Sequence, residues 1–312
     1  MGTVTPTVEQ GKNMTLNVSE YSSGYLSPFT VCIQLLYIIF LLFFLCGLVG
    51  NVKIIWILGF CIERKPFATY LLNLAVADVG TLLSGLADEM NMALVFFSPV
   101  THGGFDIISP LADVLVFFTY NASLYLLTAL SLETVLSLLF PVWYRCHRPG
   151  RSSAVISFLL WILSGLLSGI LLLCHLQGAY CGTIVNLICI VNFLVSTPLM
   201  VASSLTVTIA VCGNSRGRRL PRLYVTILTT VLVFIIFDVP LSVVYLFFSS
   251  SEDFPLEAME IIYLVASFIG SLYPLIYNLV GRDRKRQFKE SWKVVLRRLF
   301  KEEGDAREEL GK

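Results

Sequence analysis

The chain contains 312 residues, of which 56% are hydrophobic and only 14% are charged. Charged residues are about half as frequent as in ordinary soluble proteins, and the mean hydropathy is +0.79. This composition excludes intrinsic disorder, a coiled coil, a nucleic-acid-binding domain and a small disulfide-stapled domain. It favours a single large domain in a lipid bilayer.

Seven apolar stretches are long enough to cross a bilayer as helices, which takes roughly 20 residues each. Strands are disfavoured because barrel strands alternate apolar and polar residues, and a span in lipid must bond its own backbone amides. The expected fold class is therefore all-α, a seven-transmembrane helix bundle. The predicted spans cover residues 31–60, 67–87, 114–132 (extending to about 140), 154–174, 183–212, 223–248 and 261–281.

Three regions follow from these spans: an N-terminal segment of residues 1–30, a membrane domain of residues 31–281 and a tail of residues 282–312. In the tail, residues 282–300 place apolar and basic side chains at helical spacing, which predicts a short amphipathic eighth helix on the inner leaflet. An ordinary basic juxtamembrane tail is the alternative. Beyond Glu302 the tail is polar, and we expect it to be disordered.

The positions of the basic residues predict the orientation of the chain. Of the 22 Lys and Arg residues, all except Lys12 and Lys53 lie in the loops after spans one, three and five or in the tail. We therefore expect an extracellular N-terminus, a cytoplasmic C-terminus and a location in the plasma membrane. Glycosylation sequons at Asn13 and Asn17 agree, because glycans are added on the outer side.

Most of the eight cysteines lie inside predicted spans, where they act as small apolar residues. Cys174 and Cys181 differ, because they lie at the outer ends of spans four and five, on the oxidising side of the membrane. A disulfide between them would join the ends of two helices, and two unpaired thiols are the alternative. The spacing of Cys and His residues predicts no metal site.

Motifs along the spans resemble those of the rhodopsin-like G-protein-coupled receptors. They cover the whole predicted membrane domain and include polar residues in the first two spans, a tryptophan in span four and prolines in spans five to seven. In chain order they are Gly50-Asn51, Asn73-Leu-Ala-Val-Ala-Asp78, Trp161, Pro198, Pro240 and Pro274-Leu-Ile-Tyr277.

A narrower resemblance is to the Mas-related receptors. Residues 141–149, Pro-Val-Trp-Tyr-Arg-Cys-His-Arg-Pro, look like the second inner loop of that family, and residues 120–129, 197–200 and 288–296 are similar to its Mas-like members. The Cys174–Cys181 pair is also what that family suggests. The resemblance implies a receptor and not an enzyme, with an extracellular ligand and a heterotrimeric G protein of the Gq or Gi class as partners.

The sequence departs from the family pattern at three positions, of which Thr134 and Tyr273 fall in the expected signalling switch. Thr134 follows Glu133 where the family has an arginine that contacts the G protein, Tyr273 precedes the span-seven proline in place of Asn, and Asp238 replaces a tryptophan or small residue in span six. A receptor-shaped dimer partner or scaffold with weak or constitutive signalling is therefore the alternative function. The expected G-protein-facing residues are Glu133, Thr134, Arg145, Arg218, Arg219, Arg222 and Tyr277.

Two acids in the spans suggest an ion site. Asp78 resembles the sodium-binding Asp of the class and Ser123 its usual partner, while Asp238 should lie near the same level. Two acids in one low-dielectric bundle cannot both stay ionised without a cation. We hypothesise a Na⁺ or proton site formed by these three residues; a neutral, hydrogen-bonded Asp238 is the alternative. Lys53 is expected to extend toward the inner interface, with pairing to Asp78 as the other option.

The ligand pocket is expected to open outward between spans three, five, six and seven. Val116 stands where amine receptors carry an Asp, and Ile170 where some Mas-related receptors carry an acid that holds basic peptides. The outer loops carry acids without balancing cations, which favours a peptide or small cationic ligand; ordinary solvated loop acids are the alternative. An enzyme or transporter is disfavoured, because no Gly-x-Gly-Asp motif or inverted repeat is present. Candidate pocket residues are Asp113, Tyr120, Asn121 and Tyr245.

Overall fold

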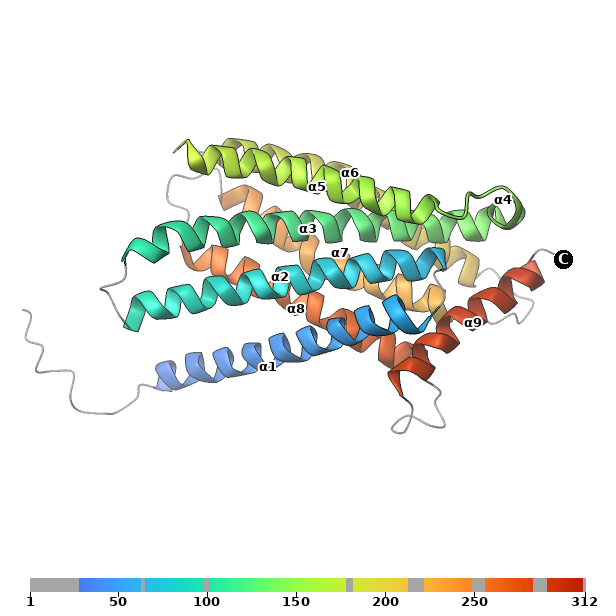
Figure 1. Ribbon diagram of the computed structural model, residues 1–312, viewed down its shortest axis with the longest axis horizontal. Helices are drawn as coiled ribbons and strands as arrows, with labels where there is room; N and C mark the ends of the chain where they lie inside the picture. Colours follow the sequence, from blue (N-terminus) through green and yellow to red (C-terminus); the bar gives the residue numbers. More distant parts are fainter. Residues whose placement is uncertain are drawn as a thin grey trace, which may run out of the picture. The chain divides into compact units, whose positions relative to one another are not determined.

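The computed structural model describes residues 28–62, 65–97, 102–177, 182–212, 222–248, 256–282 and 291–310. The chain divides into two compact units, Met1–Ile39 and Phe40–Lys312. In the first unit the described residues, 28–39, are helical. The described part of the second unit is a bundle of helices without strands (Figure 1), which confirms the expected all-α fold class.

Seven long helices correspond to the predicted spans. They are α1 (Pro28–Trp56), which the π-helical turn η2 (Ile57–Cys61) continues, α2 (Pro66–Phe97), α3 (His102–Leu139), α5 (Ser152–Leu176), α6 (Gly182–Cys212), α7 (Arg222–Phe248) and α8 (Leu256–Gly281). By length and composition, five described segments can cross a membrane, and α7 and α8 contribute the shorter apolar segments Arg222–Phe237 and Phe268–Gly281.

Two further helices lie outside the spans. The short helix α4 (Pro141–Cys146) was not predicted; it begins with a proline, whose fixed φ suits the first helical position. The helix α9 (Trp292–Leu310) packs against η2, α7 and α8. Its buried residues Val295, Leu296, Leu299 and Phe300 form the apolar side of the predicted amphipathic helix. The expectation of disorder beyond Glu302 is wrong, because α9 continues to Leu310.

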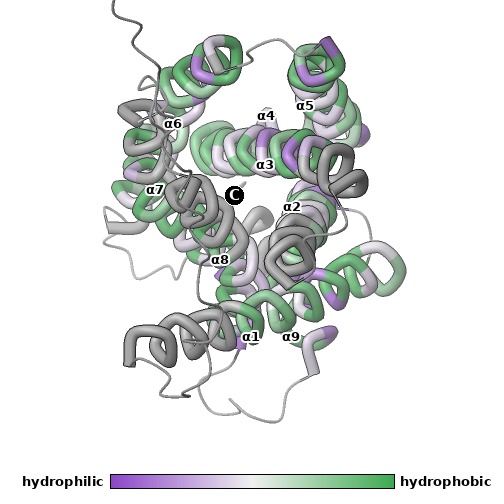
Figure 2. The backbone as a smooth tube through the Cα atoms, turned by 90° about the vertical axis from the view of Figure 1, so that its left-hand side faces the viewer, coloured by the Kyte–Doolittle hydropathy of each residue, from purple (hydrophilic) through white to green (hydrophobic). Residues whose placement is uncertain are grey.

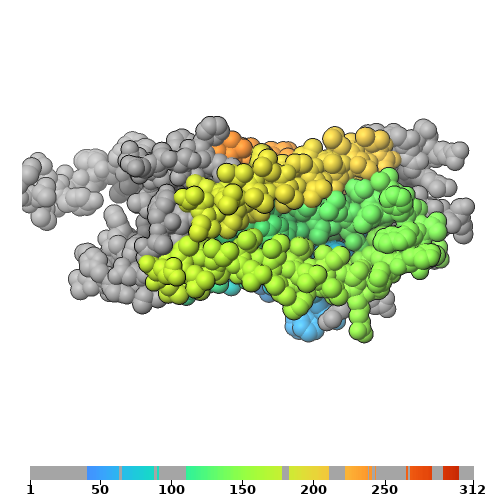
Figure 3. All heavy atoms as spheres, turned by 90° about the horizontal axis from the view of Figure 1, so that it is seen from above, coloured from blue at the N-terminus to red at the C-terminus, as the bar shows by residue number. Residues whose placement is uncertain are grey.

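The helix α3 lies at the centre of the bundle, where it contacts α2, α5, α6 and α7 (Figure 2). Around it, polar and apolar side chains are arranged as expected for a protein in lipid. On α5, Ser153, Ser157, Ser164 and Ser168 are buried, whereas Phe158 and Leu166 are 64% and 65% exposed. Small hydroxyl residues let neighbouring helices approach closely in a membrane. Exposed side chains of α6, such as Leu194 and Ile209, are likewise apolar. The helices α5 and α6 form much of the face seen in Figure 3.

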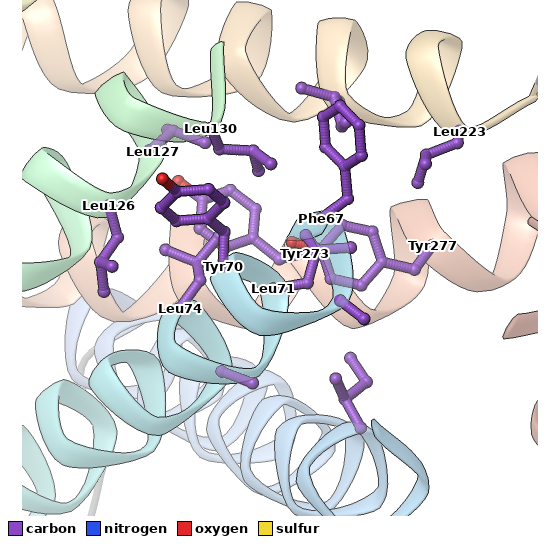
Figure 4. Close-up of a cluster of buried hydrophobic side chains, with 14 of the residues drawn as sticks. Phe67, Tyr70, Leu71, Leu74, Leu126, Leu127, Leu130, Leu223, Tyr273 and Tyr277 are labelled. Carbon is purple, nitrogen blue, oxygen red and sulfur yellow. The ribbon is translucent and has the colours of Figure 1, made fainter. Parts of the chain in front are cut away.

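The apolar core gathers side chains from α2, α3, α7 and α8. Phe67, Tyr70, Leu71 and Leu74 of α2 lie next to a leucine layer of α3 and to two tyrosines of α8 (Figure 4). The leucines are Leu126, Leu127 and Leu130, and the tyrosines are Tyr273 and Tyr277. Tyr273 is 1% exposed, so it fills core volume at the position where the class carries an asparagine.

Candidate functional site

Polar residues of the span motifs meet across helices. The Asn51 side-chain amide of α1 donates to the Gly270 carbonyl of α8 at 3.0 Å. The Trp161 indole N–H of α5 donates to Asn73 Oδ1 of α2, also at 3.0 Å. Each bond gives a polar group the hydrogen-bond partner that lipid cannot provide. It also fixes the position of one span relative to another. The motif residues therefore act as polar links between helices.

The predicted ion site is partly assembled. Ser123 Oγ of α3 donates to Asp78 Oδ1 of α2 at 3.1 Å, and the two side chains are 7% and 3% exposed. Asp78 Oδ2 is buried without a hydrogen-bond partner among the described residues. Gly270 lies beside the carboxylate, and a Cβ there would come within 3.6 Å of Asp78 Cβ. The arrangement leaves one carboxylate oxygen available for an ion or a proton.

The third member of that predicted site, Asp238, lies in α7, and its side chain falls outside the described residues. Lys53 does not pair with Asp78. Its Nζ lies 5.8 Å from the ring centre of Trp292 on α9, within the range of a cation–π contact. The lysine therefore extends toward the last helix, and its extension to the inner interface stays a prediction.

The candidate pocket residues lie along α3 and α7. Asp113 and Tyr120 are half-buried in α3; the side chain of Tyr245 is outside the described residues. Asn121 is fully buried and accepts a bond of 2.6 Å from Asn192 of α6. Tyr125 Oη donates to Asn192 Oδ1 at 2.7 Å. Asn121 thus belongs to a polar chain that links α3 to α6, which sequence reasoning missed because its members are far apart in the chain.

A buried ion pair lies at the end of the bundle where α3 ends and α5 begins, here called the Glu133 end. Arg148 Nη2 lies 2.6 Å from Glu133 Oε1, and both side chains are 6% exposed. Tyr144 Oη donates to the same Glu133 oxygen, and Arg148 also donates to Ser153 Oγ of α5. The Arg148 guanidinium lies 5.0 Å from the Tyr144 ring centre. The segment between α3 and α5 (residues 140–151, the α3–α5 loop) is therefore held by buried polar contacts.

Aromatic rings connect this ion pair to α2 and α7. The Phe67 ring of α2 stacks on Tyr144 at a centroid distance of 6.4 Å and meets Tyr224 of α7 edge-on at 6.2 Å. The Tyr224 hydroxyl is hydrogen-bonded to Ser137 of α3 at 3.1 Å. The Glu133 end thus joins the α3–α5 loop to three helices through one packed cluster.

The other predicted switch residues have different surroundings. Thr134 is 1% exposed, and its hydroxyl donates to the Leu130 carbonyl of its own helix at 2.8 Å. Arg222 Nη1 donates to the Arg282 carbonyl at 3.2 Å, so it caps the end of α8. Tyr277 is buried and Arg145 is exposed at the Glu133 end. Arg218 and Arg219 lie outside the described residues.

Two covalent features also lie largely outside the described residues. Cys174 near the end of α5 makes no disulfide within the described part of the chain. Cys181, Asn13 and Asn17 are outside it. The predicted bridge and the predicted glycosylation sites stay predictions.

Comparison with known proteins assigns the class. Residues 50–277 match the rhodopsin-family seven-transmembrane receptor domain, so the chain is a multi-pass membrane receptor of the rhodopsin-like class and not an enzyme.

The similar proteins narrow this assignment. Proto-oncogene Mas of Rattus norvegicus is 36% identical over 272 residues, which cover 85% of this chain and 83% of the relative. Mas-related G-protein coupled receptor member H of Rattus norvegicus is 36% identical over 300 residues, covering 93% and 89%. Member D of Homo sapiens is 36% identical over 278 residues, covering 83% of each. The chain belongs to the Mas-related family of G-protein-coupled receptors.

Proposed function

We propose that the chain is a plasma-membrane receptor that binds an extracellular peptide or small cationic ligand and activates a heterotrimeric G protein of the Gq or Gi class. Ligand binding would shift the populations of two arrangements of the helices, and the G protein would bind the surface that differs between them on the opposite side of the membrane. The observation that carries this proposal is the packed cluster at the Glu133 end. There α2, α3, α7 and the α3–α5 loop share buried contacts, so movement of one changes the surface formed by the others.

The orientation of the chain is part of the proposal. The Glu133 end carries Arg145, Arg148 and Arg151 in the α3–α5 loop, and basic loops favour the cytoplasmic side. The glycosylated N-terminus and the bridge between Cys174 and Cys181 would then lie outside. Ligand contacts are proposed at Asp113, Tyr120 and Tyr245; Asn121, which is fully buried, would act through its bond with Asn192.

Guanine-nucleotide exchange tests this function. Membranes that contain the full chain, supplied with Gq or Gi heterotrimers, should exchange nucleotide faster than receptor-free membranes. The variant Thr134→Arg should raise exchange further, because it restores a cation beside the G-protein-facing surface, where buried Thr134 offers none. Receptor amounts at the cell surface are measured in parallel, so that loss of protein is not read as loss of coupling.

The second candidate function is a scaffold or dimer partner with little signalling. It is favoured by Thr134, whose hydroxyl is bonded within α3 and therefore does not reach a partner. Equal exchange by wild-type and receptor-free membranes, together with measurable exchange by Thr134→Arg, would support this candidate against the receptor proposal.

We also propose that Asp78 and Ser123, with Asp238 as third member, form a Na⁺ or proton site. The buried, unpartnered Asp78 Oδ2 supports it. Sodium chloride should raise the thermal stability of the wild-type receptor above its value in choline chloride, whereas Asp78→Asn should lose that difference. The choline salt controls for ionic strength. An identical sodium response of wild type and Asp78→Asn would reject the Na⁺ site.

A further inference from the structure

We propose that Arg148 is the residue that positions the α3–α5 loop, by supplying the buried counter-charge of Glu133, and that this ion pair holds the signalling surface in its resting arrangement. The inference deepens the proposed function and rests on it for the signalling half. Arg148 is a positioning residue here, because it acts through Glu133 and Tyr144.

The first observation that supports the proposal is that the polar partners of Glu133 belong to the loop and not to its own helix. Within the described part of the chain, the hydrogen bond and the ion pair of its carboxylate both come from the α3–α5 loop, through Tyr144 Oη and Arg148 Nη2. The next residue in α3, Thr134, carries no charge and bonds the Leu130 carbonyl. A carboxylate that is 6% exposed needs a counter-charge, since an unpaired buried ion is strongly unfavourable. The loop provides that charge from outside the helix.

The second support is the way Arg148 is held. Its guanidinium contacts the Glu133 carboxylate of α3, the Ser153 hydroxyl of α5 and the face of Tyr144 in α4. Arginine suits such a position because its planar group forms several directed hydrogen bonds and also stacks on an aromatic ring. Three separate elements thus meet at one side chain, which fixes where the loop lies.

The third support links the loop to the helices around it. Tyr144 stacks on Phe67, and Phe67 meets Tyr224 of α7. Tyr224 is in turn bonded to Ser137, one turn beyond Glu133 in α3. If the ion pair breaks, the Tyr144 ring loses the guanidinium on its face, and Glu133, which accepts the Tyr144 hydroxyl, loses its counter-charge. The contact of Phe67 in α2 with the loop then weakens, and with it the connection through Phe67 to Tyr224 of α7. Alternative arrangements of the surface become accessible.

A double-mutant cycle tests the pairing without any signalling readout. Thermal unfolding is measured for the full-length receptor with Glu133→Gln, Arg148→Gln and both substitutions. Each single change leaves a buried charge unpaired, so the double variant should lose fewer degrees than the two single losses added together. Arg151→Gln, which neutralises an exposed arginine of the same loop, is the control and should be additive with Glu133→Gln. Additive behaviour of the Glu133 and Arg148 changes would overturn the proposal.

Ligand-free nucleotide exchange tests the resting arrangement. We expect Arg148→Gln to raise exchange per surface receptor by about fivefold or more, the lower range of common allosteric couplings. Arg148→Lys should keep exchange closer to wild type, because it retains the charge. The exchanged pair Glu133→Arg with Arg148→Glu should recover part of the wild-type value. A merely structural role would lower total exchange in proportion to lost protein and leave exchange per receptor unchanged. Where the receptor exchanges nucleotide above the receptor-free rate, unchanged or lower exchange per receptor in Arg148→Gln would overturn the resting role given to the ion pair.

Failure of the proposed receptor function and failure of the role given to Arg148 give different results in these experiments. If wild type, Thr134→Arg and Arg148→Gln all leave nucleotide exchange at the receptor-free rate, the proposed function is wrong. The thermal cycle still decides in that case whether Arg148 positions the loop. If exchange occurs but the cycle is additive, the receptor assignment stands and the role given to Arg148 is wrong.

Discussion

Replacing Gly47 with alanine should lower the stability of the receptor by about 3 kcal/mol, the upper range for overpacked cores. A Cβ at Gly47 of α1 would overlap Ser271 Oγ and lie 2.7 Å from Ser271 Cα. Rotation of the serine side chain can relieve the first contact. The second involves backbone, so α8 itself has to shift away from α1. We expect a lower temperature of thermal unfolding and reduced surface expression.

The control for this prediction is Gly169→Ala in α5. A Cβ at Gly169 meets nothing within 4 Å, and alanine is a better helix former than glycine by up to about 1 kcal/mol. Gly169→Ala should therefore leave thermal unfolding unchanged or raise its temperature slightly. If the two alanine variants behave alike, α1 and α8 do not approach each other as closely as described.

Replacing Phe67 with alanine should cost about 3–5 kcal/mol, the usual range for deleting a fully buried phenylalanine ring. Phe67 is 0% exposed and lies between Tyr144 of α4 and Tyr224 of α7. Its removal opens a cavity in the cluster at the Glu133 end, which weakens both ring contacts. Thermal unfolding of the solubilised receptor measures the loss directly.

Phe158→Ala removes a ring of the same size from the outer side of α5, where the side chain is 64% exposed. Few protein contacts are lost there, so the unfolding temperature should change little. Comparable losses for Phe67→Ala and Phe158→Ala would show that the effect comes from reduced hydrophobicity in general and not from the packing of this cluster.

The spans could be predicted because lipid imposes a simple rule on the sequence. A helix that crosses the bilayer needs a long apolar run, so the stretch from Thr183 to Cys212 could be recognised from composition alone, and α6 covers the same residues. The pairing of Ser123 with Asp78 could also be expected, because both positions match a known motif and both are polar in an apolar setting.

The parts that sequence reasoning missed depend on contacts between segments. Arg148 could be recognised as one of several basic loop residues, but no local pattern shows that it is buried against Glu133. The helix α4 has only six residues, too few for a periodic pattern in the sequence, and it buries Tyr144. Residues 302–310 were expected to be disordered from their polarity, whereas they continue the helix that Trp292 begins.

The placement of serines toward the interior and leucines toward the exterior of α5 has a consequence for how this receptor can diverge. An outward residue such as Leu166 needs only to be soluble in hydrocarbon, so Ile, Val, Met or Phe would serve equally well. An inward residue such as Ser164, which donates to the Phe118 carbonyl of α3, is restricted in both size and polarity. Amino-acid substitutions in α5 should therefore be frequent among natural variants at the outward-facing leucine positions and rare at the inward-facing serine positions.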